Sequence, residues 1–227
     1  MGLADGRITG DSTLFAQITN DVNLALDSAL RIIFEVGGRW QFDDSNHTDY
    51  PIIVTNIVDG QRDYSFTTDG SSNLILDIYR VAILPSATST LYEDITPVDV
   101  QSDSDPGGLV ENNTTEGRPE RYDKTANGIF LDPIPSYNAT NGLKVWINRE
   151  GSYFTTADTN KKPGIAGIFH EYLAIRPSYY FAMRNSLPNT ALLREEMLRM
   201  ERAITEYYAN RERDVRHILR GKKINYI

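Results

Sequence analysis

The sequence predicts an α+β protein in which a helical bundle, built from both ends of the chain, carries an inserted antiparallel β module. Near both termini, apolar residues recur every three or four positions, which is typical of amphipathic helices. Between them, apolar residues alternate with polar ones or form short runs, as strands do. The chain therefore divides into an N-terminal helix (1–45), a β-rich module (46–160), C-terminal helices (161–219) and an extended basic tail (220–227).

The first helix is predicted from about Ser12 to Val36. Its apolar stripe follows the helical repeat, and Asp11 with the next two residues offers N-cap oxygens. Gly37 and Gly38 supply a stop. Trp40 and Phe42 follow directly, and we expect them to pin the helix exit to the core, although Trp40 could instead contact a partner.

Strands are predicted in the middle of the chain. They cover Ile52 to Val58, Leu74 to Leu84, Leu91 to Ile95, Arg121 to Asp123, Ile129 to Leu131 and Lys144 to Arg149. Asp59-Gly60 and Asn127-Gly128 are each flanked by strand patterns, which predicts two hairpins. The polar, acidic stretch from Asp103 to Gly117 is interpreted as a loop.

Two further helices are predicted after Lys161. The first runs from Ile168 through Tyr172 and is broken or kinked at Pro177. Leu187-Pro188-Asn189 forms a turn, and the last helix extends from Ala191 to about Ile218. Its apolar stripe comprises Leu193, Met197, Met200, Ile204 and Tyr208, while Arg and Glu residues occupy the other faces.

Charge is spread unevenly along the 227 residues. The net charge is −8, yet residues 166–227 hold 11 basic and 7 acidic residues, which leaves 12 basic and 24 acidic residues elsewhere. This acidic balance argues against general nucleic-acid binding. The chain has no Cys, no apolar run long enough to span a membrane and no secretory signal pattern.

Motifs for catalysis or cofactor binding are missing from the sequence. His170-Glu171 lacks the second His that a zinc helix requires, because position 174 is Ala. No phosphate-binding glycine loop or nucleophile elbow occurs. Asp103-Ser104-Asp105 opens like a calcium loop but lacks its later ligands. We therefore expect no catalytic residues, no metal site, no cofactor and no enzymatic activity.

Several stretches of the chain resemble the head-to-tail adaptor (connector) proteins of tailed bacteriophages. They are residues 37–44, 60–66, 118–122 and 128–135, together with the Tyr- and Arg-rich helices after Ala166. The resemblance covers about Ser12 to Arg220. Thr67-Thr68 departs from it, because a Leu-Pro pair is expected to close that strand.

The resemblance implies a structural virion protein that assembles as a dodecameric ring on the portal protein and connects the DNA-filled capsid to the tail. Its other partner would be a tail, nozzle or stopper protein, and DNA would pass through the lumen without specific binding. It implies assembly in the host cytoplasm, location at the head-tail interface and no membrane contact. An acidic lumen would avoid sticking to phosphates.

Site residues follow from this resemblance and from the predicted helix faces. The basic C-terminal stretch is expected to bind the portal through Arg213, Arg216, Arg220, Lys222, Lys223, Tyr226 and Ile227. The subunit interface is expected at Arg194, Glu195, Arg199, Arg202 and Glu206. The β module is expected to face the tail with Asp59, Gly60, Asn127 and Gly128.

Other interpretations stay open from the sequence. The basic C-terminal stretch could be a solvated helix face, or it could bind nucleic acid instead of an acidic protein partner. The chain could also be a tail-completion, stopper or nozzle-type virion protein. From other classes, it could be a carbohydrate-binding module on a helical stalk or an enzyme acting on cell walls.

Overall fold

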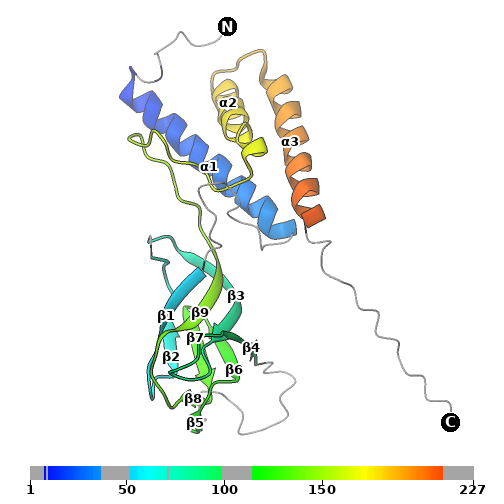
Figure 1. Cartoon of the computed structure of the whole chain (residues 1–227). Coiled ribbons are helices and arrows are strands. Elements are labelled where there is room, and N and C mark those ends of the chain that lie inside the picture. Colours follow the sequence, from blue (N-terminus) through cyan, green and yellow to red (C-terminus); the bar gives the residue numbers. More distant parts are fainter. Residues whose placement is uncertain (1–7, 9, 37–51, 71, 99–113, 212–227) are drawn as a thin grey trace, which may run out of the picture. The chain divides into compact units, whose positions relative to one another are not determined.

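The computed structural model describes residues 8, 10–36, 52–70, 72–98 and 114–211. The chain forms two compact units (Figure 1), which we call the helical unit and the β unit. The helical unit comprises residues 1–40, 154–158 and 167–227, and the β unit comprises residues 41–153 and 159–166. Both ends of the chain therefore belong to the helical unit, and the α+β fold class predicted from the sequence is confirmed.

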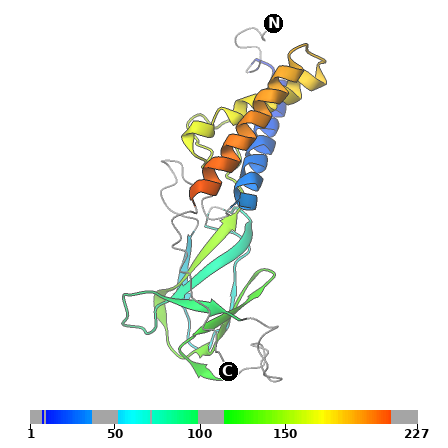
Figure 2. The ribbon, with the colours of Figure 1, turned by 90° about the vertical axis from the view of Figure 1, so that its right-hand side faces the viewer.

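Three helices make up the helical unit, and each packs against the other two (Figure 2). They are α1 (Ser12–Val36), α2 (Tyr172–Arg184) and α3 (Thr190–Arg211). A short 3₁₀ turn, Gly167–Phe169, precedes α2. None of the described helices is apolar over a stretch long enough to cross a membrane.

Helix α1 begins as the sequence predicts. One carboxylate oxygen of Asp11 accepts hydrogen bonds from the backbone N–H groups of Thr13 (3.0 Å) and Leu14 (3.1 Å), which caps the first turn. Its buried apolar stripe comprises Ala25, Leu26, Ala29, Leu30 and Ile33. The proposed Gly37-Gly38 stop and the aromatic residues Trp40 and Phe42 lie outside the described residues.

Helix α2 differs from the prediction. It runs unbroken through Pro177, whose side chain is buried, while Ile168 belongs to the separate 3₁₀ turn. Proline can occupy this place because Pro177 is only the sixth residue of α2, so the missing N–H disturbs one early turn. The turn at residues 187–189 links α2 to α3 as predicted. The predicted continuation of α3 to Ile218 lies partly outside the described residues.

Helix α3 buries the stripe that its sequence pattern indicates. Met197, Met200, Ile204 and Tyr208 are buried, and Leu193 is half-buried near the start of the helix. Their spacing of three or four residues places them on one side of the helix. Five charged residues between them are exposed, namely Arg194, Glu195, Arg199, Arg202 and Glu206.

The β unit is a curled sheet of seven strands in the order β1-β9-β3-β4-β6-β7-β2, accompanied by a two-stranded β5-β8 pair. The strands are β1 (Ile52–Ile57), β2 (Asp63–Ser65), β3 (Ile75–Ile83), β4 (Glu93–Pro97), β5 (Glu116–Gly117), β6 (Arg121–Thr125), β7 (Gly128–Asp132), β8 (Ile134–Pro135) and β9 (Ala139–Arg149). Most pairs are antiparallel, as expected, but β4-β6 and β5-β8 are parallel. Strand β5 also lies within the stretch predicted as a loop, most of which is outside the described residues.

One hairpin prediction is confirmed and the other is wrong. Strands β6 and β7 pair across Asn127-Gly128, with Thr125 opposite Gly128. At Asp59-Gly60 the chain does turn, since the N–H of Gln61 donates to the carbonyl of Val58 (3.1 Å) and Gly60 has φ = 74°. However, β1 and β2 lie at opposite ends of the strand order, because β1 pairs with β9 and β2 with β7. A turn signal specifies local backbone geometry and leaves the choice of pairing partner open.

Alternating residues of the strands meet inside the curl of the sheet. The core includes Ile57, Tyr64, Ile78, Val81, Ile83, Tyr122, Ile129, Leu131, Leu143, Val145 and Ile147. Because successive side chains of a strand point to opposite faces, the residues between these form the outward face of the sheet. The core of the β unit thus fixes which side chains are presented outward.

Candidate functional site

Within the described part of the chain, no three His, Asp or Glu side chains lie close enough together to hold a metal ion. His170 is half-buried just before α2, and the other two histidines, His47 and His217, lie outside the described residues.

The five residues predicted for the subunit interface are all exposed on α3. They are Arg194, Glu195, Arg199, Arg202 and Glu206. At 100° per residue, the last four lie on the side opposite the buried stripe, and Arg194 lies beside it. Arg199 pairs with Glu196 and lowers the pKa of that carboxyl through the hydrogen bond between them. The resulting face carries both charge signs and no buried group.

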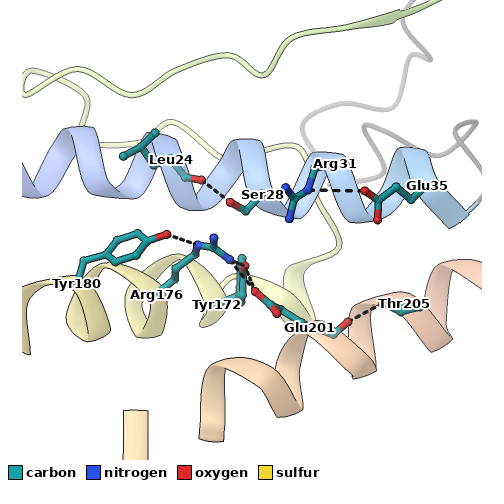
Figure 3. A network of polar contacts seen from close by, with 9 residues as sticks. All are labelled: Leu24, Ser28, Arg31, Glu35, Tyr172, Arg176, Tyr180, Glu201 and Thr205. Carbon is teal, nitrogen blue, oxygen red and sulfur yellow. Dashed lines mark hydrogen bonds and ion pairs between the residues drawn. The ribbon is translucent and has the colours of Figure 1, made fainter. Parts of the chain in front are cut away.

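The inner side of α3 joins α2 through a polar network (Figure 3). The buried Tyr172 hydroxyl donates to an oxygen of Glu201 (2.8 Å), and the same oxygen accepts from Arg176 (2.6 Å). The Nε of Arg176 donates to the Tyr180 hydroxyl (3.0 Å). Burial, followed by the hydrogen bond to Glu201, raises the pKa of Tyr172, so the phenol stays protonated. The network therefore fixes the register of α2 against α3.

Two polar contacts tie α1 to other parts of the helical unit. The buried carboxylate of Asp21 pairs with Arg184, near the end of α2. The side-chain amide of Asn23 donates to the carbonyl of Phe154 (2.9 Å) and accepts from its N–H (2.8 Å). These contacts hold α2 and the segment 154–158 against α1.

An open groove of about 800 Å³ lies in the helical unit where α1, α2 and the start of α3 meet. It is lined by Ile18 and Val22 of α1, by Pro177 and Phe181 of α2, and by Leu193 near the start of α3. Charged side chains are absent from its described lining. The apolar stripe of α1 is fully buried from Ala25 to Ile33. It also includes Ile18 and Val22 nearer the start of the helix, which are only half-buried and line the groove.

The four β-module residues predicted to face the tail are divided between two ends of the β unit. At Asp59-Gly60, the N–H groups donate to Asn138 Oδ1 (3.0 Å) and to the Pro135 carbonyl (2.8 Å). This end lies beyond the Ile57↔Ala139 pair of strands β1 and β9. The chain enters β1 and leaves β9 at the other end, so the Asp59-Gly60 turn is remote from the entry point.

Asn127-Gly128 lies at the entry end instead. The carbonyl of Asn127 accepts a hydrogen bond from the N–H of Phe66 (2.6 Å). Thr67 follows Phe66 in the chain, and its carbonyl accepts a hydrogen bond from the N–H of Ile75 (3.0 Å). Ile75 in turn pairs with Arg149, where the chain leaves the sheet. The structure therefore does not bring the two predicted turns together, and only Asp59-Gly60 occupies the far end.

The outward face of β1, β9, β3 and β4 carries alternating cations and aromatic rings, which the sequence analysis missed. The guanidinium of Arg80 lies 4.3 Å from the ring centre of Trp146. The ammonium of Lys144 lies 4.0 Å from the ring centre of Tyr92 and 5.9 Å from that of Trp146. The alternation around Trp146 was a visible signal, but Arg80 comes from β3 and Tyr92 from the segment just before β4.

The seven residues predicted to bind the portal, from Arg213 to Ile227, lie outside the described residues. Charge nevertheless divides sharply between the two units. The β unit holds 9 of the 23 basic and 18 of the 31 acidic residues, a net charge of −9. The helical unit holds the other 14 basic and 13 acidic residues, a net charge of +1.

Comparison with known proteins gives no assignment: no protein-family model matches the chain, and neither does any curated protein sequence.

Proposed function

We propose that this protein is a structural component of a tailed-bacteriophage particle, an adaptor that forms a ring on the portal and joins the head to the tail. The observation that carries the proposal is the arrangement of the chain. Both chain ends belong to one helical unit, and the β unit is inserted between α1 and α2. The resemblance to head-to-tail adaptors implies the same layout, with an N-terminal helix, an inserted β module and long C-terminal helices.

The exposed face of α3 supports assembly into a ring. Glu195 and Glu206 flank Arg199 and Arg202 there along one side of the helix. A face with both charge signs can meet a different face of the next copy, and a contact between two different faces closes into a ring when the rotation permits. The rigid junction of α2 with α3 through Tyr172 and Arg176 gives that face a fixed position within the helical unit.

The charge division supports the passage of DNA. A unit with a net charge of −9 repels phosphates, so DNA would not adhere to it during packaging or ejection. The helical unit, near neutrality, is the better candidate for packing against another protein ring. We expect acidic side chains in the lumen, and a lumen lined by Lys and Arg would contradict this assignment.

The decisive experiment is native mass spectrometry of the chain mixed with the portal ring of the same genome. We expect the portal to carry a closed ring of about twelve added copies. A variant lacking residues 220–227 should lose attachment while its melting temperature stays unchanged, because the sequence predicts for these residues an extended tail without core packing. A portal that remains bare in the presence of the intact chain would refute the adaptor function and favour a stopper or nozzle role on the tail side.

A further inference from the structure

Lys144 occupies an unusual position on the outward face of the β unit. Its ammonium stacks on the rings of Tyr92 and Trp146 but has no carboxylate partner among the described residues. The neighbouring Arg80 differs, because both its Nε (2.9 Å) and Nη2 (2.8 Å) donate to the carboxylate of Asp94. In a unit with twice as many acidic as basic residues, Lys144 is a cation whose charge the described chain leaves uncompensated.

Apolar side chains lie beside Lys144 on the same face. Strand register places Val54 opposite Lys144 and Ile52 opposite Trp146. Val54 is 43% exposed, and Trp146 is half-buried. A Trp, a Tyr and aliphatic groups around a cation form the composition that dominates binding energy at protein interfaces. We call this the Lys144 face.

The other half of the same sheet presents the complementary chemistry. On strands β2, β7 and β6, register places Asp63, Phe130 and Asp123 side by side in one row. Their sequence neighbours Tyr64, Leu131 and Tyr122 are in the core, so this row points outward. Asp63 and Asp123 form no ion pair within the described chain, and cross-strand neighbours lie about 5 Å apart. We call this row the Phe130 face.

We propose that the Lys144 face of one copy binds the Phe130 face of a second copy, so that Lys144 reaches the carboxylates of Asp63 and Asp123 while Trp146 and Val54 cover Phe130. The inference rests on the proposed ring and adds to the α3 face a second contact, between the β units of neighbouring copies. Charge complementarity indicates a second copy as the binding partner of the Lys144 face. Lys144, which has no carboxylate partner among the described residues, would meet Asp63 and Asp123, which have no cationic partner there, on either side of Phe130. The two faces come from different strands, so each copy uses two different surfaces. Such a heterologous contact suits a closed ring.

Charge exchange provides a test that does not depend on the portal. Sedimentation equilibrium of the full chain measures self-association directly. Lys144→Glu should weaken it by about a hundredfold, because it replaces attraction with repulsion, and Asp63→Lys/Asp123→Lys should do the same. Mixing these two variants should restore association, since the glutamate introduced in one variant would meet the lysines introduced in the other, and the two unaltered faces would also pair.

Matched controls separate this contact from general effects of charge and stability. Lys144→Gln and Ala126→Glu each make the net charge more negative by one, and Ala126 is exposed in the β6-β7 turn. We expect Lys144→Gln to weaken association about tenfold, Ala126→Glu to leave it unchanged and Lys144→Arg to retain it. Unchanged far-UV CD spectra would verify that the variants fold.

The outcomes distinguish this inference from the proposed function. Equal association of Lys144→Gln, Ala126→Glu and the natural chain would overturn the inference, as would failure of the mixed variants to recover. If the natural chain stays monomeric alone, ring filling on the portal replaces sedimentation as the readout for the same variants. If Lys144→Glu still formed a full ring on the portal, only the contact proposed here would be refuted. If the portal stayed bare while the chain self-associated through Lys144, only the adaptor function would be refuted. A chain that is monomeric in both settings would refute both.

Discussion

Replacing Glu201 by Met should destabilise the helical unit more than its position near the surface suggests. The pair with Arg176 is largely enclosed, with side-chain exposures of 15% for Arg176 and 25% for Glu201. Removing one partner of a fully buried pair costs about 3–5 kcal/mol, because the other charge loses its compensation. The remaining exposure lets water reach the pair, so we expect a loss of about 2–3 kcal/mol for Glu201→Met.

A double-mutant cycle tests whether the two residues act together. Arg176→Met/Glu201→Met removes both charges, so neither is left buried alone. The double variant should therefore lose at least about 1.5 kcal/mol less than the sum of the single losses. Arg31 and Glu35 on α1 supply a matched pair at 71% and 67% exposure, and their coupling should be below about 0.5 kcal/mol.

Urea unfolding followed by CD at 222 nm reports mainly on the helical unit, since the β unit contributes little signal at that wavelength. With a slope of about 1 kcal/mol per molar urea, Glu201→Met should lower the midpoint by about 2 M or more. Additive losses at Arg176 and Glu201 within about 0.5 kcal/mol would refute the reasoning. They would mean that solvent compensates each charge separately and that the network does not couple α2 to α3.

Two further predictions concern the β unit. Gly128→Ala should destabilise it by about 3 kcal/mol in urea unfolding, because a Cβ would clash with the carbonyl of Tyr64. Gly60→Ala should cost only about 1 kcal/mol, because a Cβ has open space there and only the backbone conformation (φ = 74°) is unfavourable. Equal losses for the two variants would contradict this reasoning. Burial raises the pKa of Tyr64, Tyr122 and Tyr137 above the ordinary 10.0. Because the folded state holds these protons more tightly, their contribution is complete below about pH 10 and is lost as the pH rises above it. Stability should therefore fall above about pH 10. Exposed tyrosines such as Tyr153 and Tyr207 should ionise first, and a further rise in the 295 nm absorbance should accompany unfolding. Complete tyrosine ionisation before unfolding would contradict the burial argument.

Local signals predicted α1 and α3 closely. The repeat from Phe15 to Ile33 and the cap at Asp11 define α1, and the stripe from Met197 to Tyr208 defines the buried side of α3. These succeed because a helix makes its hydrogen bonds within one continuous segment, so its burial pattern is written in neighbouring residues. The exposed side of α3, and with it the predicted interface residues, followed directly from that pattern.

Pairing in the β unit could not be predicted in the same way. Asp59-Gly60 and Asn127-Gly128 carry equivalent turn signals, yet only the second joins two paired strands. Strand β1 is completed by β9, which lies far along the chain, and β4 lies parallel to β6. Such pairings depend on side chains from distant segments filling one core, which no short window of sequence contains.

The sequence by itself determined the fold class, the order of helical and β-rich segments and the buried sides of α1 and α3. Tertiary structure alone decided which distant residues share a surface. It placed Lys144 among Tyr92, Trp146 and Val54, and it separated the Asp59-Gly60 turn from Asn127-Gly128. The reason is that periodicity orients side chains within one element, whereas a surface is assembled from several elements whose register is set by packing of the whole core.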